Sequence, residues 1–192
     1  MQSARRLATY EDLLALPEDV HAEVIDGVIV TPPAPLPRHG LAQRALGRYI
    51  GGPFHDDDGR GGPGGWWILP EVDIRFEAHQ ILRPDLAGWK RERLPHPWDL
   101  RPIEVVPDWV CEVLSPSNQS SDRVKKRNIY AAHRVAFYWI VDPAERTLEA
   151  LRLDADGKHW IEEGVFDDTA VARVAPFDAI ELDVARLFPP IP

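Results

Sequence analysis

The stretch PDWVCEVLSPSN, residues 107–118, contains six residues, Trp109 to Leu114, that are apolar except for one carboxylate, Glu112. A short apolar run rich in aromatic and β-branched residues predicts a buried strand. Side chains alternate along a strand, so Glu112 lies on the face opposite Trp109 and Val113. A buried ionised carboxylate is costly unless it is paired, hydrogen-bonded or bound to a cation. Glu112 therefore needs an ion-pair partner, a bound cation or a strand end that opens to water.

A helix and a second apolar strand follow this run. Residues 122–134, DRVKKRNIYAAHR, come after several serines that offer caps for a helix. Residues 135–142, VAFYWIVD, are apolar almost throughout, as expected of a central strand covered on both faces. We therefore predict the order strand, helix, strand across residues 108–142.

One face of this helix carries three polar side chains that could take part in a reaction. Asp122, Lys126 and Tyr130 recur every four residues, so they lie roughly along one side of the helix. A helix that follows a strand packs back on the sheet, which can bring a lysine near the carboxylate of that strand. Lys126 is the better candidate than Lys125, which lies about 100° around the helix.

The remaining segments predict a mixed sheet with helices packed on it. Thr9 and Asp12 have capping-box spacing before a short helix, and an Asp-Gly pair joins two β-rich runs in 22–31. We expect one α+β (α/β) domain over residues 1–192, a mixed β-sheet flanked by helices with β-hairpins at both ends. The other expected elements are a helix from Leu41 that ends at Gly51 and Gly52, a loop over 55–65, a half-buried strand over 66–78, a hairpin over 148–163 and a last helical turn over 183–188.

Composition limits the function classes. The net charge of -9 argues against a chain that coats nucleic acid non-specifically, because such binding needs cations to neutralise phosphates. A single cysteine, Cys111, excludes an internal disulfide and fits a reducing compartment. No apolar run approaches the roughly 18 residues that a membrane span requires. We therefore expect a cytoplasmic protein that does not enter a membrane.

A second acid strengthens the case for a cation site. Asp85 follows Pro84 at the start of an apolar stretch, and its spacing to Glu112 is that of two carboxylates on adjacent strands. Two such acids repel each other unless a proton or a cation intervenes. Their hard oxygen ligands point to Mg²⁺ or Mn²⁺, with the carbonyl of Val113 as an additional ligand.

Pro84-Asp85 with Glu112-Val113-Leu114 resembles the PD-(D/E)xK nuclease superfamily, although Leu114 stands where that pattern has its lysine. The longer match resembles the Uma-two family of restriction-endonuclease-like proteins over nearly the whole chain. It comprises TYEDLLALPED at 9–19, AEVIDGVIV at 22–30, the Pro-Arg-His at 37–39, RPDLAGW at 83–89, PDWVCEVLSPS at 107–117, the series Asp122, Lys126 and Tyr130, and FYWIVDP at 137–143.

The resemblance implies a restriction-endonuclease-like fold in which the lysine has moved onto the following helix, which agrees with Lys126. It also implies that Glu23 lies beside Asp85 and Glu112, although a glutamate on a hairpin strand more often faces solvent. His39 matches a family histidine and is expected to be structural or to contact phosphate.

The leading hypothesis is a Mg²⁺- or Mn²⁺-dependent endonuclease that hydrolyses phosphodiester bonds of nucleic acid, with DNA as the expected substrate. Glu23, Asp85, Glu112 and Lys126 would be the catalytic residues. The substrate would contact His39, Arg123, Lys125, Arg127 and Tyr130. Two alternatives stay open: an inactive nuclease-fold module that binds DNA or a protein partner, and a hydrolase of a small phosphorylated compound. A homodimer would place one active site on each strand of a DNA duplex. The tryptophan-rich segments could cover the interface of such a dimer or fill the core.

Overall fold

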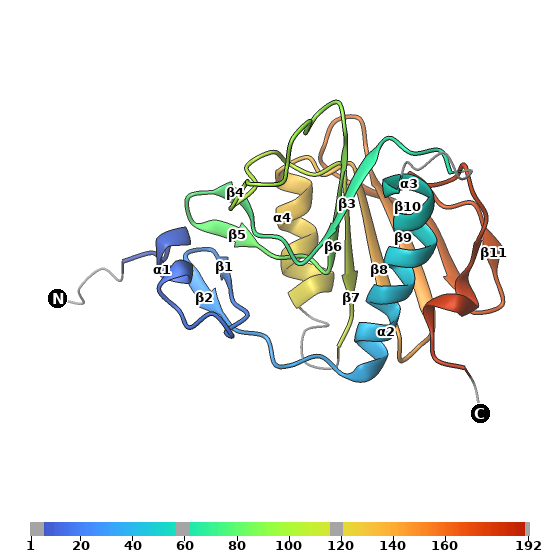
Figure 1. Cartoon of the computed structure of the whole chain (residues 1–192), viewed down its shortest axis with the longest axis horizontal. Coiled ribbons are helices and arrows are strands. Elements are labelled where there is room, and N and C mark those ends of the chain that lie inside the picture. Colours follow the sequence, from blue (N-terminus) through green and yellow to red (C-terminus); the bar gives the residue numbers. More distant parts are fainter. Residues whose placement is uncertain (1–5, 57–61, 116–120, 191–192) are drawn as a thin grey trace.

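The larger of two main sheets has six strands in the order β10-β9-β8-β7-β6-β3 (Figure 1). These coordinates are a computed structural model that describes residues 6–56, 62–115 and 121–190. Strands β7 and β8 are parallel and the other neighbours are antiparallel. The strands are β3 (Trp66–Pro70), β6 (Leu86–Lys90), β7 (Trp109–Val113), β8 (Phe137–Asp142), β9 (Thr147–Leu153) and β10 (Trp160–Asp167).

The parallel pair β7 and β8 is joined by a helical crossover, as the sequence predicted. The crossover begins with a π-helical segment, η2 (Ser121–Lys126), and continues as α4 (Arg127–Ala132). Ile129 and Tyr130 of α4 are buried in one apolar cluster with residues of β7 and β8. The crossover therefore packs back on the strands that it connects.

The opposite face of the sheet is covered by α2 (Pro37–Leu46), the π-helical turn η1 (Gly47–Gly51) and α3 (Gly52–His55). The expectation that this helix ends at Gly51 and Gly52 is wrong, since the helical path passes through both glycines. Each glycine in a helix costs about 1 kcal/mol relative to alanine. Leu46, Ile50 and Phe54 are buried against the sheet on either side of the glycines, and their burial outweighs that cost.

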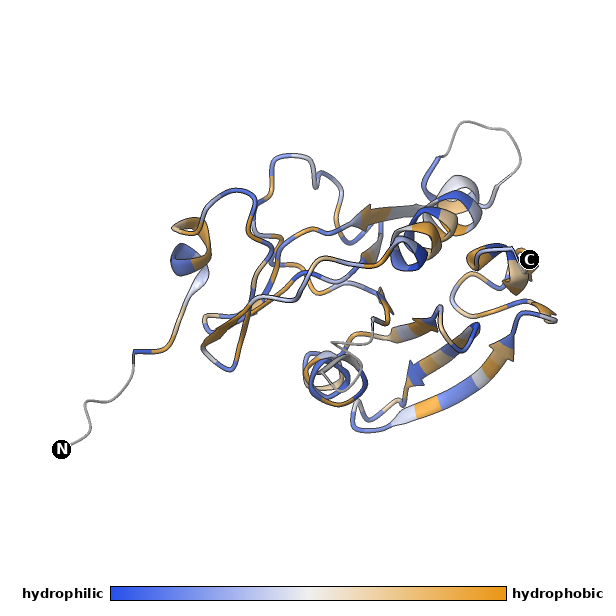
Figure 2. Ribbon diagram, turned by 90° about the horizontal axis from the view of Figure 1, so that it is seen from below, coloured by the Kyte–Doolittle hydropathy of each residue, from blue (hydrophilic) through white to orange (hydrophobic). Residues whose placement is uncertain are grey.

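A smaller sheet has four strands in the order β2-β1-β5-β4. The Asp-Gly hairpin is confirmed, because Asp26 and Gly27 both have positive φ, as a type I′ turn requires. The short helix α1 (Tyr10–Leu14) begins with the expected capping box. Both views place α1 and this sheet to one side of the larger sheet (Figures 1 and 2). Its strands are β1 (Glu23–Ile25), β2 (Val28–Val30), β4 (Ile74–Glu77) and β5 (Gln80–Leu82).

The expectation of one half-buried strand over residues 66–78 is wrong. The chain leaves β3 of the larger sheet after Pro70, turns at Glu71, which has a φ of 49°, and enters β4 of the smaller sheet. It returns from β5 to β6 through Pro84 and Asp85. Alternation along the sequence reports which residues share a face, but not which sheet they join.

The C-terminal part completes the larger sheet and its cover. The predicted hairpin is present as β9 and β10, and Gly157 in its turn has a φ of 72°. The predicted last helical turn is the 3-10 helix η3 (Val184–Leu187), which follows the short strands β11 (Val171–Ala172) and β12 (Leu182–Asp183). Within the described ranges, none of the helices combines the length and apolar character that crossing a membrane would demand.

Candidate active site

Glu112 is the last residue but one of the buried strand β7 and is only 2% exposed. Its neighbours along the strand divide between two apolar clusters. Trp109 and Val113 belong to the cluster that includes α2, whereas Val110 and Leu114 belong to the cluster that includes α4. Alternation therefore directs Glu112 toward the α4 side of the sheet.

Lys126, at the last position of η2, supplies the cation that Glu112 requires. Its ammonium Nζ lies 3.0 Å from Oε1 of Glu23 and 3.1 Å from Oε1 of Glu112, and the residue is only 6% exposed. Lys125 is exposed. One buried ammonium thus joins two buried carboxylates from different sheets.

Tyr130, one helical turn after Lys126, donates a hydrogen bond from its hydroxyl to Oε1 of Glu112 at 2.5 Å. Burial raises the pKa of Tyr130 well above its usual value, and the negative charges of Glu112 and Glu23 raise it further. The phenol therefore stays protonated and remains a donor. Oε1 of Glu112 thus accepts the hydrogen bond from the Tyr130 hydroxyl and also pairs with the Lys126 ammonium, so two side chains fix the position of this carboxylate.

Glu23 opens β1, and its side chain is anchored from the smaller sheet. Oε1 of Glu23 accepts the backbone N–H of Arg83 at 2.8 Å. Arg83 directly precedes Pro84 and Asp85, so this bond connects the start of β1 to the segment that leads into β6. The structure thereby places Glu23, expected from the family resemblance, beside Lys126 and Glu112.

Asp85 lies just before β6, at the end of the larger sheet. Its Oδ2 accepts the backbone N–H of Val113 at 2.6 Å, and its Oδ1 lies 3.1 Å from Nε2 of His39 at the start of α2. The β6–β7 register pairs Leu86 with Cys111, so one further residue along each strand brings Asp85 opposite Glu112. Residues directly opposite on neighbouring strands share a face of the sheet.

Gln43 is a contact of this segment that the sequence reading missed. Its Nε2 donates to the backbone carbonyl of Asp85 at 3.1 Å and to Oε1 of Glu71 at 2.9 Å. Gln43 follows His39 by four residues, so both lie on one face of α2. That spacing was the signal available in the sequence.

The arginines of this helical crossover pair with acids other than Glu23 and Glu112. Arg123 pairs with Oε2 of Glu149 at 2.8 Å and lies 3.7 Å from Oδ2 of Asp142, while Arg127 lies 3.9 Å from Oε1 of Glu149. These cations are directed toward β8 and β9 rather than toward Glu112. The side chain of Asp122 lies outside the described part of the chain.

The donor set fits a hard divalent cation with few protein ligands. In the described segments, no three His, Cys, Asp or Glu side chains gather in a metal-binding arrangement. Mg²⁺ commonly binds through one or two carboxylates and keeps several waters for substrate phosphates to replace. Asp85 and Glu112 would supply two such carboxylates; Glu112 is paired with Lys126, and Asp85 lies against the imidazole of His39.

Comparison with known proteins defines the class. A crystal structure of a protein described as "a putative nuclease belonging to DUF820" from Anabaena variabilis ATCC 29413 superposes with a TM-score of 0.71 and 26% identity. The match covers 93% of this chain and 96% of that one. The fold is therefore that of a nuclease-like α+β protein, as expected.

The family follows from the sequence itself. Residues 7–185 match the family model Uma2 (Uma-two), described as "Putative restriction endonuclease". This chain belongs to that family, which confirms the resemblance. No curated protein matches the chain.

Proposed function

We propose that this protein is a metal-dependent nuclease that hydrolyses phosphodiester bonds of nucleic acid, with DNA as its substrate. The observation that carries the proposal is the Lys126 ammonium held between Glu23 and Glu112, beside the strand end where Asp85 meets the backbone of Val113. Family membership and the nuclease-like fold support the same activity.

Asp85, Glu112 and the carbonyl of Val113 would hold Mg²⁺ or Mn²⁺. A bound divalent ion supplies polarisation of a phosphoryl oxygen and a lowered pKa for attacking water. Glu23, Glu112 and Lys126 together carry a net charge of about -1, and Asp85 adds to it, so this corner of the molecule favours a cation.

Each chain residue then has a defined task. Lys126 neutralises charge that grows on the phosphoryl group, because its ammonium is fixed in a site of low water content. Glu23 holds that ammonium in place. Tyr130 orients Glu112, and His39 orients Asp85, each through a contact with the carboxylate itself.

The test is cleavage of plasmid and single-stranded DNA in Mg²⁺ or Mn²⁺. We expect Asp85→Ala and Lys126→Ala to lose cleavage, whereas Lys158→Ala, a change at an exposed lysine between β9 and β10, retains it. Cleavage that survives in Asp85→Ala or Lys126→Ala would overturn the assignment of those residues.

A binding module without catalysis is the second candidate. Its support is that Lys126 already pairs with Glu112 and that three ready metal-ligating side chains do not meet within the described residues. Calorimetric titration with Mn²⁺ separates the two. The nuclease requires one stoichiometric site that disappears in Glu112→Ala, and the binding module requires none.

A further inference from the structure

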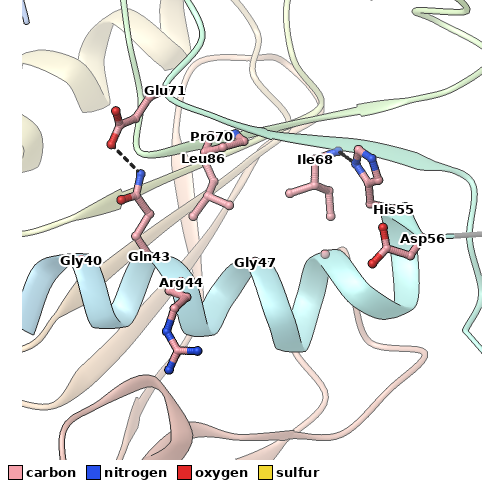
Figure 3. A pocket seen from close by; sticks show the side chains of 11 residues that line it. Gly40, Gln43, Arg44, Gly47, His55, Asp56, Ile68, Pro70, Glu71 and Leu86 are labelled. Atoms are coloured by element: carbon pink, nitrogen blue, oxygen red, sulfur yellow. Dashed lines mark hydrogen bonds between the residues drawn. The ribbon is translucent and has the colours of Figure 1, made fainter. Parts of the chain in front are cut away.

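A polar bridge crosses the place where the two main sheets part. The last pair of β3 and β6 joins Pro70 to Leu86. Glu71 follows β3 and Asp85 precedes β6, so these two residues flank the same end of the strand pair. Gln43 of α2 connects them, because its Nε2 donates to Oε1 of Glu71 at 2.9 Å and to the backbone carbonyl of Asp85 at 3.1 Å. Figure 3 shows the Gln43 amide pointing toward Glu71.

Asp85 lies in a bend before the first residue of β6, so strand pairing alone does not fix its main chain. Each of its three oxygens has a contact. Oδ2 accepts the N–H of Val113, Oδ1 lies 3.1 Å from Nε2 of His39, and the backbone carbonyl accepts Gln43. His39 and Gln43 are four residues apart on α2. One helix therefore holds both the carboxylate and the main chain of Asp85, the latter through Gln43.

Glu71 determines which way the amide of Gln43 faces. A glutamine side chain is long and flexible, and the two ends of its amide differ, one donating and the other accepting. A carboxylate accepts hydrogen bonds and donates none, so the contact with Glu71 selects the NH₂ end of the amide. That group has a second N–H, which is then available to the carbonyl of Asp85.

The contact between Glu71 and Gln43 adds little to the stability of the fold. The side chain of Glu71 is 42% exposed, and both residues line an open groove of about 650 Å³ along α2 (Figure 3). Water competes for both partners of such a contact. The backbone of Glu71 is also strained, since its φ of 49° lies in the left-handed region. A strained residue with an exposed side chain beside a candidate active site indicates a role other than stability.

We propose that Glu71 and Gln43 form a positioning pair that fixes the main chain at Asp85 and thereby sets the affinity of the site for its divalent ion. The inference rests on the proposed function, because it takes Asp85 as a metal ligand. Gln43 acts on Asp85 directly, and Glu71 acts through Gln43. Contacts that orient metal ligands in this way commonly change metal affinity or activity by about 10- to 100-fold.

Calorimetric titration with Mn²⁺ tests the pair. We expect Gln43→Ala and Glu71→Ala each to weaken Mn²⁺ binding about tenfold, the lower end of the range for contacts that orient a metal ligand. Glu71→Gln keeps a side-chain carbonyl that can accept from Gln43, so it should bind Mn²⁺ as the wild type does. Arg44→Ala is the matched control, because Arg44 is the next residue of α2 and points to the other side of the helix (Figure 3).

The double variant Gln43→Ala/Glu71→Ala separates positioning from a direct effect of charge. If Glu71 acts through Gln43, the double variant should bind Mn²⁺ as weakly as Gln43→Ala alone. If the charge of Glu71 attracts the ion directly, the two losses should multiply, and Glu71→Gln should bind as weakly as Glu71→Ala. That second result would overturn the pair.

Glu71→Gly separates positioning from stability. Glycine adopts the left-handed conformation without a steric cost. Glu71→Gly should therefore unfold at a higher temperature than Glu71→Ala and yet bind Mn²⁺ equally weakly. Recovery of Mn²⁺ affinity together with stability in Glu71→Gly would reveal a merely structural role and overturn the pair.

Hydrogen exchange of the Val113 amide reports the position of Asp85 without any metal, because this N–H donates to Oδ2 of Asp85 at 2.6 Å. In Gln43→Ala we expect about fivefold faster exchange, the effect of losing about one hydrogen bond. The amide of Leu114 is the internal control, since it donates to the carbonyl of Val141 in β8 at 2.8 Å and should keep its rate.

The outcomes separate this inference from the proposed nuclease. Unchanged Mn²⁺ affinity and unchanged Val113 exchange in Gln43→Ala, in a protein that cleaves DNA, would overturn the pair and leave the nuclease standing. Weaker Mn²⁺ binding and faster Val113 exchange in Gln43→Ala, in a protein that cleaves nothing, would support the pair and overturn the nuclease. A wild type that binds no Mn²⁺ would overturn both, because Asp85 would then not be a metal ligand.

Discussion

Two buried carboxylate clusters in this protein are built from similar parts and differ in charge. The lysine cluster comprises Glu23, Glu112, Lys126 and Tyr130. The arginine cluster comprises Asp73, Arg83, Arg101 and Tyr10. In both, a tyrosine hydroxyl donates to a buried carboxylate, Tyr130 to Glu112 at 2.5 Å and Tyr10 to Asp73 at 3.1 Å.

The arginine cluster has more cations than carboxylates. Oδ1 of Asp73 accepts Nε of Arg83 at 2.7 Å and lies 2.7 Å from its Nη2, while Nε of Arg101 lies 3.6 Å from Oδ2. One carboxylate thus faces two guanidinium groups. The arginine cluster connects α1, the end of β5 and the segment before β4, and its role is therefore structural. Among the residues that the structure describes, the lysine cluster has two carboxylates for one ammonium, so its carboxylates outnumber its cations. The comparison of the two clusters indicates that an excess of carboxylates over cations, rather than burial, distinguishes the candidate active site.

The largest expected effect is the loss of the ammonium in Lys126→Met. Two buried carboxylates would then face each other without a cation, and we expect a loss of about 3–5 kcal/mol in the free energy of unfolding. Mn²⁺ should restore part of that stability, because a divalent ion can take the place of the ammonium between Glu23 and Glu112. Chemical denaturation with and without Mn²⁺ measures both effects.

Lys125→Met is the matched control for this variant, since the exposed neighbour should change stability by only about 0.5 kcal/mol. A Lys126→Met protein as stable as the wild type, or one that Mn²⁺ does not stabilise, would contradict the charge imbalance described for the lysine cluster.

The corresponding change in the arginine cluster, Arg83→Met, should be smaller. Asp73 keeps the Tyr10 hydroxyl and the nearby Arg101, so we expect a loss of about 1.5–3 kcal/mol, that of hydrogen bonds to a charged group. Mn²⁺ should not restore it. Arg101→Met, whose side chain is largely exposed, should cost less than about 1 kcal/mol. Recovery of Arg83→Met stability on addition of Mn²⁺ would abolish the distinction between the clusters.

A further expected effect concerns pH and Tyr130. Its folded pKa is raised above the unfolded value near 10, so the folded protein keeps a proton that the unfolded chain releases. Stability from this group is complete below about pH 10 and is lost as pH rises toward the folded pKa, by at most about 1.4 kcal/mol per pH unit. Tyr130→Phe should show a shallower decline of unfolding midpoints between pH 9 and 11. Equal slopes in both proteins would contradict this.

The centre of the candidate site could be predicted because local periodicity determines directions. Alternation along β7 places Glu112 opposite Trp109, and the helical period turns Lys126, but not Lys125, toward the sheet. Asp-Gly chemistry likewise determined the hairpin that carries Glu23.

What the sequence did not reveal depends on long-range pairing. Tyr10 and Asp73 are 63 residues apart, and Glu23 meets the backbone of Arg83 across 60 residues. Nothing in the pattern over 66–78 indicates that Glu71 separates two sheets. The continuous helix through Gly51 was also missed, because its stability comes from the burial of Ile50 and Phe54 on the sheet rather than from local preference.

Both carboxylates of the lysine cluster stand on strands, whereas the ammonium stands on a crossover helix. A cation at Leu114, directly after β7, would be held by the sheet, since the backbone N–H of Leu114 donates to the carbonyl of Val141 in β8. Lys126 instead keeps its position only while Ile129 and Tyr130 hold α4 on that sheet. Gentle heating that loosens α4 would separate the opposite charges first, so we expect heat inactivation to set in below the temperature at which the strands melt.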